Sequence, residues 1–197
     1  SEDGLVWSGQ GKTVFTESAT SILWFKNKWI ATGAGGNSLA YSTDGINWTG
    51  LSTSIFSVSG NGISVSPDTL VACGEGTNTL ATSEDGIVWT GLGVSVFSEK
   101  CLKVNYTGTR WVAAGQGTNT LAYSTNGTNW TGNDKTVFPT TANSAVSNNP
   151  FGGYNLPSQL FIDEDTGIRQ TFNLEFVSDT AYSNNSMVAI NITSQNI

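Results

Sequence analysis

The sequence predicts an all-β protein built from four-stranded blades of the β-propeller type, followed by a C-terminal β extension. The first observation is a nine-residue motif that recurs at one fixed spacing: SEDGLVWSG, STDGINWTG, SEDGIVWTG and STNGTNWTG begin at Ser1, Ser42, Ser83 and Ser124. A fixed period of about 40 residues is the mark of a tandem structural repeat. The second observation is composition, because 23 glycines and only 12% charged residues are typical of short strands joined by tight turns.

Each motif is predicted to form the tip of a β-hairpin. Asp-Gly and Asn-Gly pairs accept the positive φ angles of a type I′ turn, and between apolar residues they are a strong hairpin signal. The predicted turn residues are Asp3, Gly4, Asp44, Gly45, Asp85, Gly86, Asn126 and Gly127. We expect these glycines to have positive φ, and we expect a strand carrying Trp48, Trp89 or Trp130 to follow the tip.

A second hairpin precedes the first one in each period, so that one period holds four short antiparallel strands. Its strands are predicted at residues 22–25 and 29–33, 63–65 and 70–74, and 102–106 and 111–115. Four strands in about 40 residues is the content of a propeller blade. A β-solenoid is the alternative, but its coils are shorter and parallel.

The repeat predicts three complete blades, at residues 20–50, 61–91 and 102–132, while residues 1–9 supply the last strand of a preceding blade. The periodicity fades from about Asn133. Closed propellers have four to eight blades, so three and a fraction do not close. Either the parent chain has more blades, or the tail completes a small ring, or subunits share one.

The motif Ser-x-Asp-Gly-x-x-Trp resembles a contracted Asp-box, the repeat of bacterial neuraminidases. The fuller pattern, seen at Gly115 to Gly132 and nearly complete at Gly33 to Gly50, resembles tandem propeller-like repeats in proteins of large DNA viruses and of some bacteria. The resemblance covers residues 1 to about 138. It implies a structural turn that hydrolases, receptors and assembly factors share, so it identifies the repeat rather than an activity.

Three regions follow from these patterns. Residues 1–138 are the repeat region, residues 139–158 are a Pro/Asn/Ser/Gly-rich linker, and residues 159–197 are the β extension. Strands are expected at 159–162, 171–177 and 187–192, either completing the partial blade or, as we favour, docking to a partner.

Composition argues against several classes of partner. The net charge is −7, and no run of Lys or Arg offsets it, so nucleic acid is not an expected partner. No apolar stretch is long enough to span a bilayer, so no membrane contact is expected. Cys73 and Cys101 are expected to be buried free thiols rather than a disulfide.

The sequence also argues against catalysis, cofactors and metals. The chain has no histidine, which removes the commonest general base and metal ligand. Asp-box sialidases are implied to need three arginines, and this chain has only Arg110 and Arg169. The acidic run at residues 163–165 matches no calcium loop and is expected to be a solvated turn. Six of the seven tryptophans occupy repeated positions and are expected in the blade core, with Trp24 the exception.

We therefore expect a non-enzymatic structural or surface protein of a virus particle, located in the virion, that acts through contacts with other protein subunits. The viral part rests on the resemblance alone. A secreted or surface carbohydrate-binding propeller that contacts a host glycan is the alternative, and an enzyme fragment is a third reading. The candidate contact residues, on loops expected to share one rim, are Asn37, Glu75, Asn78, Gln116 and Asn119.

Overall fold

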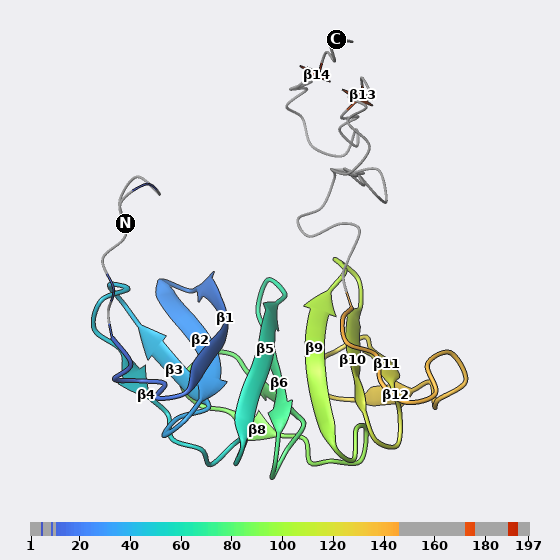
Figure 1. Cartoon of the computed structure of the whole chain (residues 1–197), viewed down its shortest axis with the longest axis horizontal. Helices are drawn as coiled ribbons and strands as arrows, with labels where there is room; N and C mark the ends of the chain where they lie inside the picture. Colours follow the sequence, from blue (N-terminus) through green and yellow to red (C-terminus); the bar gives the residue numbers. More distant parts are fainter. Residues whose placement is uncertain (1–4, 6–8, 10, 146–171, 176–188, 193–197) are drawn as a thin grey trace, which may run out of the picture. The chain divides into compact units, whose positions relative to one another are not determined.

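A computed structural model describes residues 5, 9, 11–145, 172–175 and 189–192 (Figure 1). The chain divides into two compact parts, Ser1–Val146 and Ser147–Ile197. The turn residues Asp3 and Gly4, Trp7, the strand expected at 159–162 and the acidic run at 163–165 lie outside the described residues.

The first part is an all-β structure in which every strand pairing is antiparallel, as the sequence predicts. Three successive four-stranded meanders repeat along the chain. Meander 1 contains β1 (Ser18–Phe25), β2 (Lys28–Ala34), β3 (Leu39–Ser42) and β4 (Thr49–Gly50). Meander 2 contains β5 (Ser59–Val65), β6 (Leu70–Glu75), β7 (Leu80–Ser83) and β8 (Thr90–Gly91). Meander 3 contains β9 (Lys100–Tyr106), β10 (Trp111–Gln116), β11 (Leu121–Ser124) and β12 (Trp130–Gly132).

Neighbouring meanders are joined by short backbone pairings at equivalent places. Ala34 pairs with Ser59, and Glu75 pairs with Lys100. The isolated bridge between Gln116 and Thr141 is the next member of this series, and the Ala142 N–H donates to the Gly115 carbonyl at 3.1 Å. The structural repeat therefore continues to Ala142, beyond the point near Asn133 where the sequence pattern fades. Backbone pairing preserves the repeat there because it does not depend on side-chain identity.

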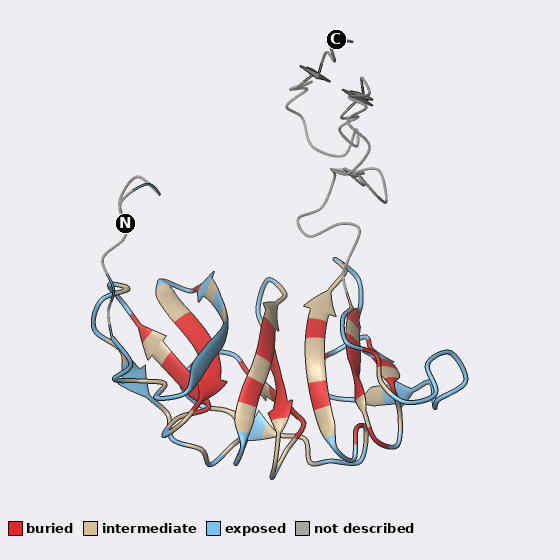
Figure 2. Cartoon of the chain, viewed as in Figure 1, coloured by how far each residue is buried: buried red, intermediate tan, exposed pale blue. Residues whose placement is uncertain are grey.

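The core lies between the meanders rather than within one of them. One cluster combines Ile30 and Leu39 of meander 1 with Phe56, Leu70 and Ala72 of the second repeat. The other cluster joins meanders 2 and 3, and its buried members include Val71, Cys73, Leu80, Phe97, Cys101, Val104 and Trp111. Successive residues of β6 thus face opposite neighbours, as the alternation of a strand requires. Figure 2 shows buried residues on strands of all three meanders.

The predicted type I′ geometry at the motif is wrong. Each of the three described motifs forms a wider loop, such as residues 43–48 between β3 and β4, and only its glycine has positive φ: 75° at Gly45, 77° at Gly86 and 78° at Gly127. A two-residue connection with positive φ at both positions is Lys26–Asn27, between β1 and β2, with values of 43° and 64°. That two-residue connection has the signature of a type I′ turn.

The tryptophans are also less buried than the repeat predicts. Of the described tryptophans only Trp111 is fully buried, and Trp29, Trp48, Trp89 and Trp130 are half-buried. Trp48 and Trp89 precede β4 and β8 instead of lying in them. The indole N–H of Trp48, Trp89 and Trp130 donates to the carbonyl of its motif glycine, which holds each ring against its own loop. Trp24 is 48% exposed.

The second part contains one described strand pair. β13 (Phe172–Glu175) pairs antiparallel with β14 (Ala189–Ile192), with Phe172 opposite Ile192. Both strands fall within the segments that the sequence predicts to be strands. No helix in the described part of the chain is long and apolar enough to cross a membrane.

Candidate functional site

Both carboxylate oxygens of the motif aspartate accept hydrogen bonds from residues of the same motif. In meander 1 the Asp44 Oδ1 atom accepts the backbone N–H groups of Ile46 and Asn47, at 2.8 and 2.7 Å, and the Ser42 hydroxyl at 3.0 Å. Asp44 Oδ2 accepts the Asn47 side-chain amide at 2.8 Å. The Ser42 hydroxyl in turn accepts the Gly45 N–H at 2.9 Å. This is an Asx-type turn, in which the carboxylate replaces backbone acceptors.

The same hydrogen bonds recur in the other two described motifs. Asp85 Oδ1 accepts the N–H groups of Ile87 and Val88, both at 2.8 Å. Asn126 Oδ1 accepts those of Thr128 and Asn129, at 3.0 and 2.8 Å. Because the amide oxygen of Asn126 accepts the equivalent two N–H groups, the motif position needs an acceptor rather than an acid, which gives it a structural role.

The electrostatics of the motif agree with that role. The Asn47 side-chain amide, the N–H groups of Asn47 and Ile46, and the Ser42 hydroxyl hold the pKa of Asp44 well below its usual value of 3.8. At Asp85 partial burial raises the pKa, but the N–H groups of Ile87 and Val88, the Ser83 hydroxyl and the charge of Lys28 more than offset it, so the pKa is lowered. A general acid needs a pKa near the working pH, so the lowered pKa values of Asp44 and Asp85 argue against a role for either carboxyl group as a general acid.

Three of the predicted contact residues form a repeated clamp inside the fold. Asn78 donates its side-chain N–H to the Ile55 carbonyl at 2.7 Å, and its Oδ1 accepts the Gly93 N–H at 2.8 Å. Asn37 and Asn119 make the same pair of bonds in the other meanders. A Cβ atom on Gly91 would overlap the Asn78 amide, which accounts for glycine as the last motif residue.

The other two predicted contact residues end their strands. Glu75 closes β6 and lies opposite Lys100, and Gln116 closes β10 and lies opposite Thr141. All five residues either end the second strand of a meander or lie in the loop that follows it, and Figure 1 shows β2 and β6 running to the lower end of the view. Glu75 and Gln116 are half-buried. Their role in binding stays a prediction, whereas the amides of the three asparagines are engaged by their own backbone.

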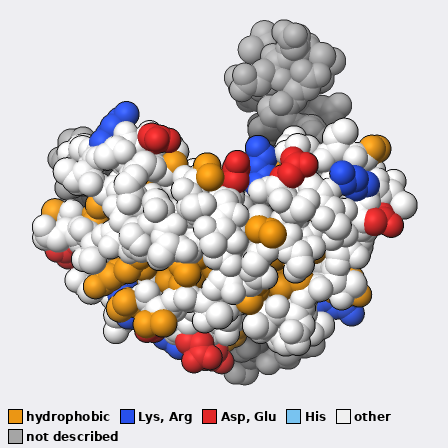
Figure 3. All heavy atoms as spheres, turned by 90° about the horizontal axis from the view of Figure 1, so that it is seen from below, with side chains coloured by type: hydrophobic (Ala, Val, Ile, Leu, Met, Phe, Trp, Pro, Cys, Tyr) orange, Lys and Arg blue, Asp and Glu red, His pale blue; other side chains and the backbone are white. Residues whose placement is uncertain are grey.

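Seen from that end, the surface is more apolar than charged. Figure 3 shows a band of hydrophobic side chains crossing this face, with scattered acidic and basic groups. Exposed apolar residues of the described chain include Val58, Val94 and Val137, at 54%, 41% and 61%. Exposed apolar side chains are therefore a feature of this part of the chain.

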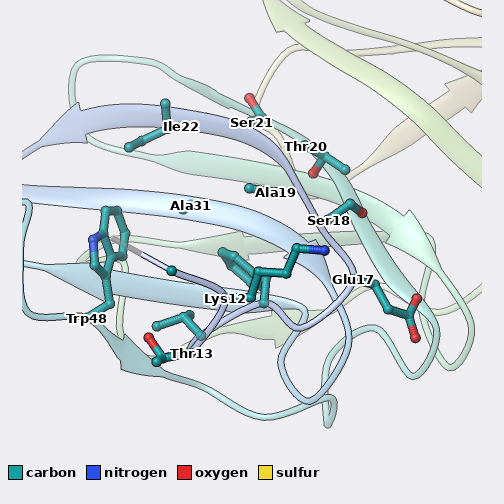
Figure 4. Close-up of a pocket in the computed structure, with 13 residues that line it drawn as sticks. Lys12, Thr13, Glu17, Ser18, Ala19, Thr20, Ser21, Ile22, Ala31 and Trp48 are labelled. Atoms are coloured by element: carbon teal, nitrogen blue, oxygen red, sulfur yellow. The ribbon is translucent and has the colours of Figure 1, made fainter. Parts of the chain in front are cut away.

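A pocket of about 470 Å³ lies on the side of meander 1 that faces away from meander 2. Its lining combines the segment from Gly11 to Phe15, the strand residues Ser18 to Ile22, Glu17, Ala31 and Trp48. In Figure 4 Trp48 and Glu17 lie at opposite ends of the pocket, with Lys12 between them. The sequence analysis did not predict this pocket. The residue that could have indicated its position is Phe15, which occupies the same repeat position as the fully buried Phe56 and Phe97.

The described residues contain no group of three His, Cys, Asp or Glu side chains placed to hold a metal ion. Cys73 and Cys101 are free thiols and both are buried, in agreement with the sequence prediction.

Comparison with known proteins gives a limited result. No protein-family model and no curated protein matches the chain. Among solved structures, the chain is similar to "Crystal structure of Niastella koreensis GH74 (NkGH74) enzyme", with 19% sequence identity and a TM-score of 0.46. The match covers 58% of this chain and 17% of that one.

Proposed function

We propose that the chain is a β-propeller-type repeat module without catalytic activity, and that each meander is one blade. In this proposal it acts through protein–protein contacts, as a structural or surface protein of a virus particle. The viral setting rests only on the resemblance of the repeat pattern to repeats in proteins of large DNA viruses. The proposal requires neither a cofactor nor a metal.

One observation supports protein contact above all. Ile22, which lines the pocket of meander 1, is 57% exposed, whereas its repeat equivalents Ile63 and Val104 are 6% and 1% exposed. Apolar surface of this kind marks sites of protein association.

The motif residues support the same reading. Asp44, Asp85 and Asn126 direct their oxygens at the N–H groups of their own loops. Repetition of these polar side chains is therefore explained by turn structure and needs no substrate.

The test is chemical cross-linking of intact particles from the source of this chain, followed by mass spectrometry of the linked peptides. We expect links from the lysines of the chain, such as Lys12 and Lys100, to other particle proteins. Absence of the chain from purified particles would overturn the viral part of the proposal. With the purified chain, Glu75→Ala and Gln116→Ala should weaken capture of the linked protein, with exposed Thr43→Ala as the control.

A carbohydrate-binding function is the second candidate, and the pocket of meander 1 favours it. The pocket places the Trp48 indole beside hydroxyl-bearing and charged side chains, which is the usual chemistry of a sugar site. A glycan panel screened with the full chain and with Trp48→Ala tests this function. Glycan binding that Trp48→Ala abolishes and Trp89→Ala preserves would favour this candidate over protein contact.

A further inference from the structure

We propose that Cys73 and Cys101 form a redox-active pair, which a low-molecular-weight disulfide such as oxidised glutathione converts into a disulfide bond between meanders 2 and 3. In the structure both residues are free thiols. The inference goes beyond the proposed function, because it assigns a covalent modification to the interior of the chain, and neither inference depends on the other.

The two cysteines stand on either side of the joint between meanders 2 and 3. Cys73 is on β6 and Cys101 is on β9, and these antiparallel strands pair at Glu75 and Lys100. Cys73 precedes Glu75 and Cys101 follows Lys100, so both cysteines lie in the same direction from that pairing. Both side chains are fully buried and belong to one apolar cluster. The two thiols are therefore neighbours in the core.

The equivalent joint between meanders 1 and 2 shows how close the two positions are. Thr32 is the repeat equivalent of Cys73, and Gly60 is the repeat equivalent of Cys101. A Cβ atom on Gly60 would lie 3.0 Å from the Cβ atom of Thr32. The two Cβ atoms of a disulfide are about 3.5–4.5 Å apart. Positions 73 and 101 therefore have the proximity that a disulfide requires.

The surroundings of the two sulfur atoms leave room for the bond. Cys73 lies opposite Gly62 of β5, and a Cβ atom on Gly62 would be 3.2 Å from the Cys73 Sγ atom. This sulfur therefore occupies space that a side chain at position 62 would take. The Cys101 thiol donates to the carbonyls of Ala114 and Lys103 at 3.5 and 3.6 Å. Because a thiol is a weak donor, forming the disulfide gives up little hydrogen bonding.

Small residues without a thiol fill the two positions in the other repeats. The equivalents of Cys73 are Thr32 and Ala114, and those of Cys101 are Ala19, Gly60 and Ala142. Packing at these positions therefore does not require sulfur. The two positions that do carry cysteine, one in meander 2 and one in meander 3, are the two that meet across a single joint.

The reaction consists of two thiol–disulfide exchanges. The thiolate of one cysteine attacks a sulfur of oxidised glutathione, so that a mixed disulfide forms and one glutathione thiolate leaves. The thiolate of the other cysteine then attacks the protein sulfur of the mixed disulfide and releases the second glutathione thiolate. The protein loses two electrons and two protons, and oxidised glutathione gains them as it becomes two molecules of reduced glutathione.

Burial controls when this reaction occurs. Both thiols are inaccessible in the closed joint, and burial together with the neighbouring Cys73 raises the pKa of Cys101. Oxidation therefore passes through an open joint or the unfolded chain. Once formed, the bond closes a loop of chain that contains β7 and β8 and restricts the unfolded state. We expect free thiols in a reducing compartment, and a more stable, cross-linked chain in an oxidising one.

The experiment refolds the full chain from urea in buffer that contains either oxidised or reduced glutathione. Each sample is then unfolded again in urea, treated with iodoacetamide and weighed by mass spectrometry. The oxidised sample should gain no alkyl group and retain no glutathione, whereas the reduced sample should be alkylated at both cysteines. Proteolysis of the oxidised sample should release the peptides of Cys73 and Cys101 as a linked pair.

Thermal unfolding of the same samples tests whether the bond fits the fold. The oxidised chain should melt about 5–10 °C above the reduced chain. The controls are Cys73→Ala and Cys101→Ala, which introduce the residues found at the equivalent positions 114 and 142. Each control has one thiol and should show no rise in melting temperature in oxidised glutathione.

Three outcomes would overturn the proposal. A wild-type chain that is still alkylated at both cysteines after refolding in oxidised glutathione shows that the pair does not react. A chain that retains bound glutathione shows that the second thiol cannot reach the first sulfur. An oxidised chain that melts below the reduced one shows that the bond strains the joint, so that the two positions do not fit a disulfide.

Discussion

Ile30 of meander 1 packs directly against Gly86 in the motif loop of meander 2. A Cβ atom on Gly86 would overlap the Cδ1 atom of Ile30, and Gly86 has a φ of 77°. Two features therefore require glycine at this position. One is the left-handed backbone conformation, and the other is the close approach of the neighbouring meander.

Replacing Gly86 with Val should destabilise the protein strongly. A left-handed conformation costs a β-branched residue roughly 1–2 kcal/mol, and overpacking against Ile30 costs about 1–3 kcal/mol more. Gly86→Ala should show the same two effects with a smaller loss of stability. Urea unfolding monitored by tryptophan fluorescence measures the free energy of unfolding of both variants.

Gly45→Ala is the matched control for Gly86→Ala. Gly45 has nearly the same φ, 75°, but only Trp29 of its own meander lies near. The difference between the two alanine variants isolates the contact with Ile30. Equal losses of stability in the two variants would contradict close packing between the meanders.

The asparagine clamp gives a second prediction. Asn78→Ala removes a donor from the Ile55 carbonyl and an acceptor from the Gly93 N–H, both partly buried. Leaving such groups unpaired costs about 1–3 kcal/mol each, so the free energy of unfolding should fall by about 2–6 kcal/mol. Asn129→Ala, at an exposed asparagine of the third motif loop, should change stability by less than about 0.5 kcal/mol. A neutral Asn78→Ala variant would show that water replaces the clamp without cost.

The clamp also shows what the sequence could and could not predict. The strands were predictable, because apolar runs such as residues 70–74 and their regular recurrence depend on local pattern. The role of Asn78 was not, because a repeated asparagine in a loop fits both a binding surface and a turn. Its partners Ile55 and Gly93 lie 23 and 15 positions away, a relationship that only the folded chain reveals.

The wrong prediction of the turn type at the motif has a related cause. Asp44-Gly45 predicts a two-residue hairpin from local preference, but Asp44 accepts N–H groups two and three residues ahead, which makes a wider loop. The pocket beside Trp48 was missed because sequence alone does not show which repeat face lacks a neighbour. Equivalence of Phe15 with Phe56 identifies the position, and only the measured exposure shows that it is incompletely covered.

The motif carboxylates predict a loss of stability in acid. A carboxylate whose pKa is lowered in the folded state stabilises the fold above its unfolded pKa, and this contribution is lost as the pH falls through the lower folded value. Asp44 and Asp85 both have lowered pKa values, so their contribution is complete above about pH 5 and declines below the usual value of 3.8.

Asp85→Asn tests this linkage, since Asn126 shows that the loop accepts an amide. The variant should unfold at lower urea than wild type at pH 7, and the difference should narrow at pH 3. Thr82→Ser, on the neighbouring strand β7, has no titrating group and should keep the pH dependence of wild type. A difference between Asp85→Asn and wild type that widens in acid would contradict the direction of the pKa shift.

The last prediction concerns the two thiols at the joint of meanders 2 and 3. Burial, together with the neighbouring Cys73, raises the pKa of Cys101 well above its usual 9.0, and both side chains are fully buried. Because the thiolate is the reactive form, neither cysteine should react with iodoacetamide in the folded protein at pH 8. Both should be alkylated in concentrated urea, as measured by intact mass.

The rate of alkylation in native buffer then reports opening of this joint. Val71→Ala, which leaves a cavity beside the pair, should therefore speed alkylation, whereas Val88→Ala on the exposed loop should not. Rapid alkylation of wild type in native buffer would show that the joint opens freely, contrary to the buried cluster that holds the meanders together.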